Sequence, residues 1–188
     1  MPSEKKLEPL KIVLYPDPVL DKKARPVTLE ELKAGRAGTH NLPELVERMV
    51  VAMYENEGVG LAAPQVGVSL RLWVADTSKD RDQPVAVFNP ELVEPAGTVE
   101  EEEGCLSLPE IKVKVKRHEQ IKVRGLDLKG QPVELECDGL MSRVAQHETD
   151  HLDGILITKY AGTAGRFMLR GKLKALEEEY AFRNRRKK

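Results

Sequence analysis

Residues 139–152 read GLMSRVAQHETDHL and predict a helix at the centre of the fold. Leu140, Val144, His147 and His151 are spaced by four, three and four residues, so a helix places them in one continuous stripe. Both histidines then extend the buried face of the helix. A buried imidazole without a polar partner is costly, and a shared metal ion would remove that cost. We therefore expect this helix to lie inside the molecule, with its histidines turned toward a metal site.

The segments before this helix predict antiparallel strands. From residue 70 to about residue 136, apolar and polar residues alternate with a period of two, which is typical of half-buried strands. The alternation is clearest at residues 70–74, 85–88, 111–116 and 121–124. Residues 126–135 indicate a hairpin around Lys129 and Gly130.

Two further helices are expected. Residues 43–56 begin with Pro43, which suits the first helical position, and Gly58 ends the helix. Residues 165–183 predict an amphipathic helix that leads into a basic end. The remaining local predictions are Asp138 as the cap of the central helix, an extended segment and turn at residues 11–20, and a loop at residues 33–42.

Together these segments predict an α+β fold, with antiparallel or mixed β-sheets packed around a central H-E-x-x-H helix and a C-terminal helix. A chain of 188 residues can bury a sizeable core, and neither an internal repeat nor a low-complexity linker divides it. We expect residues 1–188 to form a single domain with a basic tail at about residues 183–188.

The charge balance limits the possible partners. A net charge of −1 argues against a protein that binds nucleic acid over its whole surface. The N-terminus lacks the apolar segment of a secretory signal, and no stretch is long and apolar enough to cross a bilayer. We therefore expect a cytoplasmic protein without a membrane partner or a sequence-specific nucleic-acid partner. The acidic run at residues 100–103 and the basic run at residues 183–188 are expected to be solvated surface or tail, with an interaction site as the alternative.

The pair His147 and His151, with Glu148 after the first histidine, forms an H-E-x-x-H pattern. Its four-residue spacing puts both imidazoles on one helical face, where they can bind the same metal ion. Glu148 can act on a water molecule beside the metal without being a ligand. Two surface histidines in an acidic helix are the alternative, and the pattern alone does not select a family.

The third metal ligand separates the known classes. One class of zinc peptidase has a histidine at the position of Ile157, and another has a glutamate near the position of Gly171. The acidic residues 177–179 come late and resemble the solvent face of the last helix. Cys105 remains, in a loop that we expect to border the sheet, although a lone cysteine is more often an inert core thiol. We assign no chemistry to Cys137, and a disulfide is not expected in a reducing compartment.

Residues 57–67 read EGVGLAAPQVG, and their small side chains allow the backbone to approach another group closely. The segment follows a helix and lacks the Gly-Lys-Ser/Thr of a phosphate-binding loop. A plain glycine-rich turn is the alternative.

These segments together resemble the peptide deformylase family. The matching motifs are GVGLAAPQ at residues 58–65, EGCLS at residues 103–107 and QHETDH at residues 146–151, in the family's order and at its approximate separations. The resemblance covers residues 11–160. It implies a metal-dependent hydrolase that removes the formyl group from formyl-methionyl nascent polypeptides and releases formate.

The resemblance also implies roles for residues of the site. Cys105, His147 and His151 would hold one divalent ion, natively Fe²⁺, although Zn²⁺, Ni²⁺ or Co²⁺ can occupy such a site. Glu148 would serve as general base and then as acid. Gln65 and the backbone N–H of Leu106 would face the developing oxyanion. The groups expected to position the formyl-methionyl end are Val59, Gly60 and Val144.

Two other interpretations stay open at this stage. One is a zinc peptidase that uses the same helix with an acidic third ligand. The other is a ribosome- or RNA-associated binding module whose basic tail carries the function. Family members with a basic C-terminal extension suggest that the tail of a deformylase could also contact the ribosome. A metal bound through sulfur favours the deformylase over the peptidase, and turnover of a formylated peptide excludes the pure binding module.

Overall fold

The structure is a computed structural model that describes residues 8–185. It has the α+β architecture expected from the sequence. The main sheet contains β3 (Gly60–Ala62), β4 (Leu72–Ala75), β5 (Val85–Ala96), β8 (Gln120–Leu126) and β9 (Pro132–Asp138), side by side in that order. Every neighbouring pair in it is antiparallel. Because β3 is the first strand in this order, it pairs with only one other strand of the sheet.

A separate hairpin is formed by β6 (Val99–Cys105) and β7 (Leu108–Arg117). Its register shifts near the turn, since Gly104 pairs with Lys112 whereas Cys105 pairs with Leu108. Extra residues of β7 therefore bulge opposite the end of β6, and Glu110 within them has a φ of +59°. A bulge of this kind re-aims nearby side chains. It lies directly beside Cys105.

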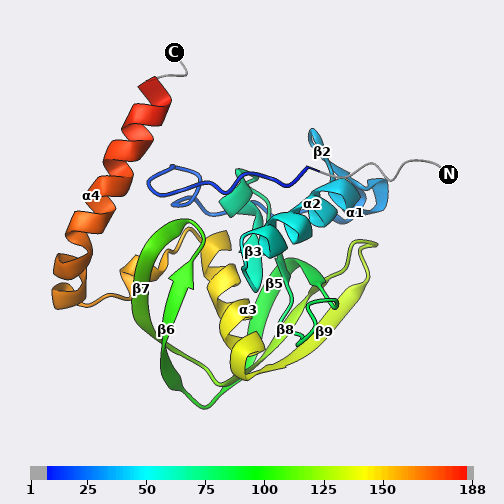
Figure 1. Cartoon of the computed structure of the whole chain (residues 1–188). Helices are drawn as coiled ribbons and strands as arrows, with labels where there is room; N and C mark the ends of the chain where they lie inside the picture. Colours follow the sequence, from blue (N-terminus) through cyan, green and yellow to red (C-terminus); the bar gives the residue numbers. More distant parts are fainter. Residues whose placement is uncertain (1–7, 186–188) are drawn as a thin grey trace.

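The helix α3 (Gly139–Leu152) occupies the space between the main sheet and this hairpin (Figure 1). On the sheet side, Val144 and Ala145 pack in a core cluster with Trp73, whose indole donates to Thr149 Oγ1 at 3.3 Å. On the hairpin side, the Gln146 amide bonds to both backbone groups of His118, at 3.0 and 2.9 Å. Because both layers hold it, α3 is buried around most of its circumference.

The predicted bounds of α3 are confirmed, with two differences in detail. Asp138 stands at the N-cap position, but its side chain makes no capping hydrogen bond. Leu140 was expected on the buried stripe, yet it is 53% exposed. The first turn of α3 extends beyond the covering layers, so the stripe becomes buried only from Val144 onward.

The N-terminal third contains more regular structure than we predicted. Helix α1 (Leu29–Ala34) was not expected, and the predicted loop at residues 33–42 is wrong in part because β1 (Arg36–Ala37) and β2 (His40–Asn41) pair within it. Reciprocal bonds between Thr28 and Glu31 form a capping box, and Gly35 ends α1 with a φ of +64°. Helix α2 (Leu42–Glu55) follows, capped by Asn41, within one residue of its predicted bounds.

The acidic run at residues 100–103 is only partly the solvated surface that we expected. Glu100, Glu101 and Glu102 are exposed, but Glu103 is 5% exposed. The loop expected at Cys105 is wrong, because Cys105 is the last residue of β6. Alternation along the strand turns Glu103 inward while Glu102 stays exposed.

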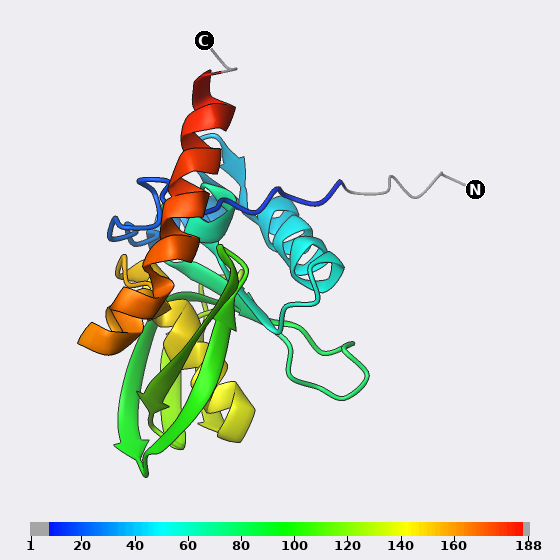
Figure 2. The same ribbon diagram turned by 60° about the vertical axis from the view of Figure 1, so that its left-hand side comes forward.

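The short helices η1 (Ala63–Val66) and η2 (Ile157–Lys159) complete the body, and α4 (Thr163–Arg185) ends the described chain. Figure 2 shows α4 standing along one side of the hairpin and extending past it. Leu169, Leu173 and Leu176 of α4 pack on the cluster that contains Leu108 and Ile111. Within residues 8–185, no helix combines the length and apolar character needed to cross a bilayer. Residues 186–188 of the predicted basic tail lie outside the described part.

Candidate active site

Three predicted metal ligands come together where α3 meets the end of β6. The donor atoms of Cys105, His147 and His151 all lie within 4.8 Å of one another, and Cys105 Sγ is 3.3 Å from His151 Nε2. A tetrahedral ion with bonds of about 2.0–2.3 Å needs donors roughly 3.3–3.6 Å apart. The pair Cys105–His151 has this spacing, and the His147 donor atom lies within 4.8 Å of both, so the three residues form a candidate site for one ion.

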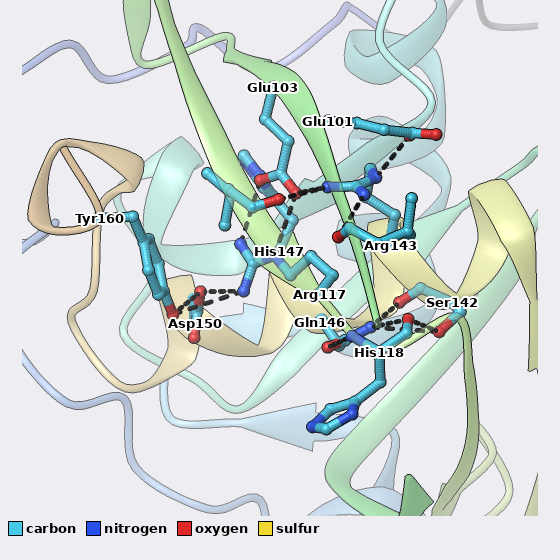
Figure 3. Close-up of polar contacts among 12 residues, drawn as sticks. Glu101, Glu103, Arg117, His118, Ser142, Arg143, Gln146, His147, Asp150 and Tyr160 are labelled. Carbon is cyan, nitrogen blue, oxygen red and sulfur yellow. Dashed lines mark hydrogen bonds and ion pairs between the residues drawn. The ribbon is translucent and has the colours of Figure 1, made fainter. Parts of the chain in front are cut away.

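Glu103 holds His147 from the side away from the candidate metal position. Glu103 Oε2 lies 3.0 Å from His147 Nδ1 (Figure 3). Burial raises the pKa of Glu103, but hydrogen bonds from His147 and Arg117 outweigh it and lower the pKa to about 2. A carboxylate at Nδ1 fixes the proton on that nitrogen and leaves Nε2 free to bind a metal.

Two buried arginines compensate the charge of Glu103. Arg117 donates to both carboxylate oxygens, at 3.0 and 3.1 Å, and Arg143 donates to Oε1 at 2.7 Å. Arg117 also reaches Asp150 at 2.6 Å, and Arg143 reaches Glu101 at 3.0 Å. Figure 3 shows this network joining α3 to both strands of the hairpin. It holds His147 and the end of β6 in a fixed relation.

Glu148 and His151 retain unused polar atoms inside the site. Among the buried side-chain atoms that the structure describes, Glu148 Oε2 and His151 Nδ1 lack a hydrogen-bond partner. Burial raises the pKa of Glu148 to about 7. Burial and the neighbouring His147 lower the pKa of His151, which keeps this imidazole neutral and able to act as a ligand. A carboxyl group whose pKa is near 7 can both accept and release a proton.

Gln65 enters the site from η1 with its amide in a fixed orientation. Its Oε1 accepts a hydrogen bond from the Ala62 N–H at 2.8 Å, and its Nε2 donates to Cys105 Sγ at 3.5 Å. The amide N–H groups are thereby aimed at the space beside the sulfur. Gln65 is 1% exposed, so water competes little for these donors.

A cavity of about 770 Å³ leads to these groups. One wall is the segment around β3, the opposite wall is the hairpin, and α3 forms the floor. The predicted positioning residues Val59, Gly60 and Val144 line it, as does Leu106. Gly60 is required by close contact, because a Cβ atom there would lie 2.5 Å from Glu148 Oε1 and 2.7 Å from Val144 Cγ1.

Eight of the nine predicted site residues line this cavity. The ninth, His151, is buried behind it, with its Nε2 atom 3.3 Å from Cys105 Sγ. The alternative positions for a third ligand do not join them. Ile157 is a buried core residue, and Glu177 lies on α4, where it accepts a hydrogen bond from Tyr15 Oη at 2.9 Å.

The sequence did not predict three further residues of the site: Glu103, Arg117 and Arg143. A glutamate two residues before the proposed cysteine ligand was a weak signal for the first, and nothing local marked the arginines.

Comparison with known proteins agrees with this geometry. The family model for polypeptide deformylase matches residues 9–166. A peptide deformylase of Tolumonas auensis is 46% identical over 167 residues, covering 89% of this chain and 95% of that protein. The solved peptide deformylase of Legionella pneumophila superposes with a TM-score of 0.78 at 40% identity, covering 92% of this chain and 98% of that one. For the Thermotoga maritima enzyme the TM-score is 0.72 at 46% identity, with coverages of 81% and 97%. The chain belongs to the polypeptide deformylase family, the metal-dependent hydrolases that remove the N-formyl group from nascent polypeptides.

Proposed function

We propose that residues 8–185 act as one catalytic domain in which Cys105, His147 and His151 hold the metal ion of this deformylase. The donor set supports the assignment, since one cysteine sulfur and two imidazole nitrogens suit Fe²⁺ or Zn²⁺. Glu103, which accepts a hydrogen bond from Arg117, orients His147 as the carboxylate partners of metal-bound histidines do elsewhere. When bound, a divalent ion supplies positive charge that lowers the pKa of water and polarises a carbonyl oxygen.

In this proposal, Glu148 moves the protons of the reaction. It first accepts a proton from the attacking water and then donates it to the departing amine of the methionine. Its unpartnered Oε2 and its raised pKa support both steps. The Gln65 amide, aimed by Ala62, and the backbone N–H of Leu106 donate to the oxygen that gains charge on the formyl carbon.

The formyl-methionyl end is proposed to lie extended in the cavity beside the edge strand β3. Gly60 lets the substrate backbone approach Glu148 closely, and Val59 and Val144 provide apolar contacts for the first side chain. Addition of an extended peptide to an unpaired strand edge satisfies backbone groups on both chains.

The observation that carries the proposal is the cluster of Cys105, His147 and His151 beside an unpartnered Glu148 oxygen. Its test is formate release from a formyl-Met peptide by protein purified without oxygen, together with analysis of the bound metal. We expect about one metal ion per chain and release of formate. Cleavage of internal peptide bonds without formate would instead support a peptidase.

For the native metal we propose Fe²⁺. A thiolate and ferrous iron are both oxidisable, so activity should be lost in air. Substitution by Ni²⁺ or Zn²⁺ at the same ligands should slow that loss. Equal rates of inactivation for the three metal forms would contradict the assignment of iron.

We also propose that the basic C-terminal end contacts the ribosome in the cytoplasm. Most of α4 lies beyond the residues that the family model matches, and its last turn carries Arg183 and Arg185. Contacts of Lys and Arg with phosphates would make the association salt-dependent. Deleting residues 183–188 should preserve turnover of short peptides and weaken co-sedimentation with ribosomes. Unchanged co-sedimentation would show that this end is only solvated surface.

A further inference from the structure

Arg81 contacts the wall of the active-site cavity from the outside. It belongs to the segment between β4 and β5, a loop that projects from the body in Figure 2. Its Nη2 donates a short hydrogen bond to the carbonyl oxygen of Gly58. Gly58 lines the cavity together with Val59 and Gly60, whereas Arg81 does not. The arginine thus holds one peptide group of a wall that the substrate is proposed to touch.

The guanidinium of Arg81 is itself held in place by Tyr54. Its central carbon lies 5.0 Å from the centre of the Tyr54 ring, a cation–π arrangement. Tyr54 belongs to the last turn of α2, and its hydroxyl donates to Asp76 Oδ2 at 2.5 Å. Arg81 is therefore tied to a helix as well as to its own loop.

Asp76 connects this arrangement back to the same wall. It is 2% exposed, and its carboxylate accepts bonds from the backbone N–H groups of Ser78 and Gln83, at 2.8 and 3.0 Å. Its own N–H donates to the carbonyl of Val59 at 3.0 Å. Consecutive carbonyl groups of the wall, those of Gly58 and Val59, are thus bonded to the segment that starts at Asp76.

The stretch that Arg81 stabilises has little support of its own. Helix α2 ends at Glu55, and Glu57 has a φ of +56°, a conformation that costs free energy in a residue other than glycine. The N–H of Gly58 still reaches back to Met53 at 2.9 Å, but its carbonyl points away from the helix to Arg81. A Cβ atom on Gly58 would lie 2.9 Å from Leu106 Cδ1, so this stretch already touches the opposite wall. Small shifts of Gly58 would change the width of the cavity.

We infer that Arg81 is a positioning residue for the deformylation of peptides longer than formyl-methionine. Through the carbonyl of Gly58 it keeps the cavity wall at the spacing that an extended substrate requires. Gly60 lies beside Glu148, where the formyl group reacts, whereas Gly58 lies farther along the wall. The residues that follow methionine therefore depend on Gly58 more directly than the reacting group does, because Gly58 approaches the side chain of Leu106 and not Glu148. The inference rests on the proposed function.

The experiment compares formyl-Met-Ala with formyl-Met-Ala-Ala-Ala as substrates of the metal-loaded enzyme. In Arg81→Ala we expect KM for the longer peptide to rise ~3–10-fold, the effect of one lost hydrogen bond, with kcat within about two-fold of wild type. KM for the shorter peptide should change less than about two-fold. Arg81→Lys keeps the charge but loses the planar guanidinium group. Its KM for the longer peptide should lie between the values for wild type and Arg81→Ala.

Arg124→Ala serves as the matched control. Arg124 pairs with Glu134 at 2.7 Å and with Glu94 at 3.1 Å on the main sheet, away from the cavity. It should leave both KM values unchanged. Formate release by the wild-type enzyme tests the proposed function, whereas the KM comparison between variants tests the role of Arg81. If wild type is active but Arg81→Ala leaves KM unchanged, or raises it equally for both peptides, the inference is overturned while the proposed function stands.

Discussion

Glu103 Oε2 lies 3.0 Å from His147 Nδ1, and this contact joins a strand residue to a helix residue 44 positions later in the chain. The same carboxylate receives Arg117 and Arg143, so it stays ionised although it is buried. An ionised acceptor holds the His147 proton on Nδ1 and aims the other nitrogen at the candidate metal position. The geometry of the site therefore depends on a residue that is not itself a ligand.

Glu103→Gln should weaken metal binding by about 10–100-fold, because the orientation of His147 is less well fixed. It should also lower the free energy of unfolding by about 3–5 kcal/mol, since Arg117 and Arg143 lose their buried counter-charge. Metal titration and denaturant unfolding measure the two effects. Glu100→Gln on the exposed part of the same strand is the control and should stay within about 0.5 kcal/mol of wild type. Equal behaviour of the two variants would contradict the role of Glu103.

The two cysteines should respond differently to substitution. Cys105→Ala removes a proposed ligand, so bound metal and formate release should fall together. Cys137 is packed in the core beside Ile121, and burial raises the pKa of its thiol to about 11. Cys137→Ala should therefore leave metal content and turnover unchanged. Retained metal with normal turnover in Cys105→Ala would remove Cys105 from the ligand set.

Gly60→Ala tests the close approach of β3 to Glu148. The added methyl group would lie 2.5 Å from Glu148 Oε1, so the carboxylate or the strand must shift. Formate release should fall about 10²-fold or more, as expected when a general acid–base is displaced. Gly171→Ala is the matched control, because a Cβ atom on Gly171 meets open space on α4. That variant should keep its activity and gain about 0.5–1 kcal/mol of stability. Similar activities for the two variants would contradict the crowding argument.

Asp76 should make the unfolding free energy depend on pH in acid. Burial raises the pKa of Asp76, but hydrogen bonds from Ser78, Tyr54 and Gln83 outweigh it and lower the pKa to about 2, from 3.8. A lowered folded-state pKa means that the stabilisation is complete above pH 3.8 and is lost as the pH falls toward 2. Asp76→Asn should be about 1–3 kcal/mol less stable at neutral pH. Its deficit relative to wild type should shrink across that window, as denaturant unfolding between pH 2 and 6 would show. A difference in unfolding free energy that stays constant between pH 2 and 6 would contradict a stabilising role for the ionised Asp76.

Helices and strands could be predicted from the sequence where a local pattern of apolar residues determines which face of the element is buried. The helical stripe through Leu140, Val144, His147 and His151 predicted the helix α3, because burial of one face requires that spacing, although Leu140 itself is exposed. The two-residue alternation predicted β7 and β8 for the same kind of reason. Helix α1 was missed although Thr28 and Glu31 form a readable capping box, since the segment is short and carries few apolar residues.

The partners of the site could not be predicted in the same way. Glu103 stands in an acidic run that, read locally, predicts solvent exposure. Its burial is stabilised by Arg117, which is 14 residues away, and by Arg143, which is 40 residues away. Only the pairing of β6 with β7 and the packing of α3 bring these charges together. A charged residue can be buried when oppositely charged partners surround it, and here those partners are too far away in the sequence for a local pattern to reveal them.

The most direct test of the account is the Glu148→Gln variant, assayed in one preparation for bound metal and for formate released from a formyl-Met peptide. Glu148 is proposed to move protons without being a ligand, so the variant should keep its metal and its fold. Turnover should fall ~10²–10⁴-fold, which corresponds to roughly 3–5 kcal/mol of barrier. Normal formate release by the metal-loaded variant would contradict the proton-transfer role, and loss of the metal together with activity would instead make Glu148 part of the metal site.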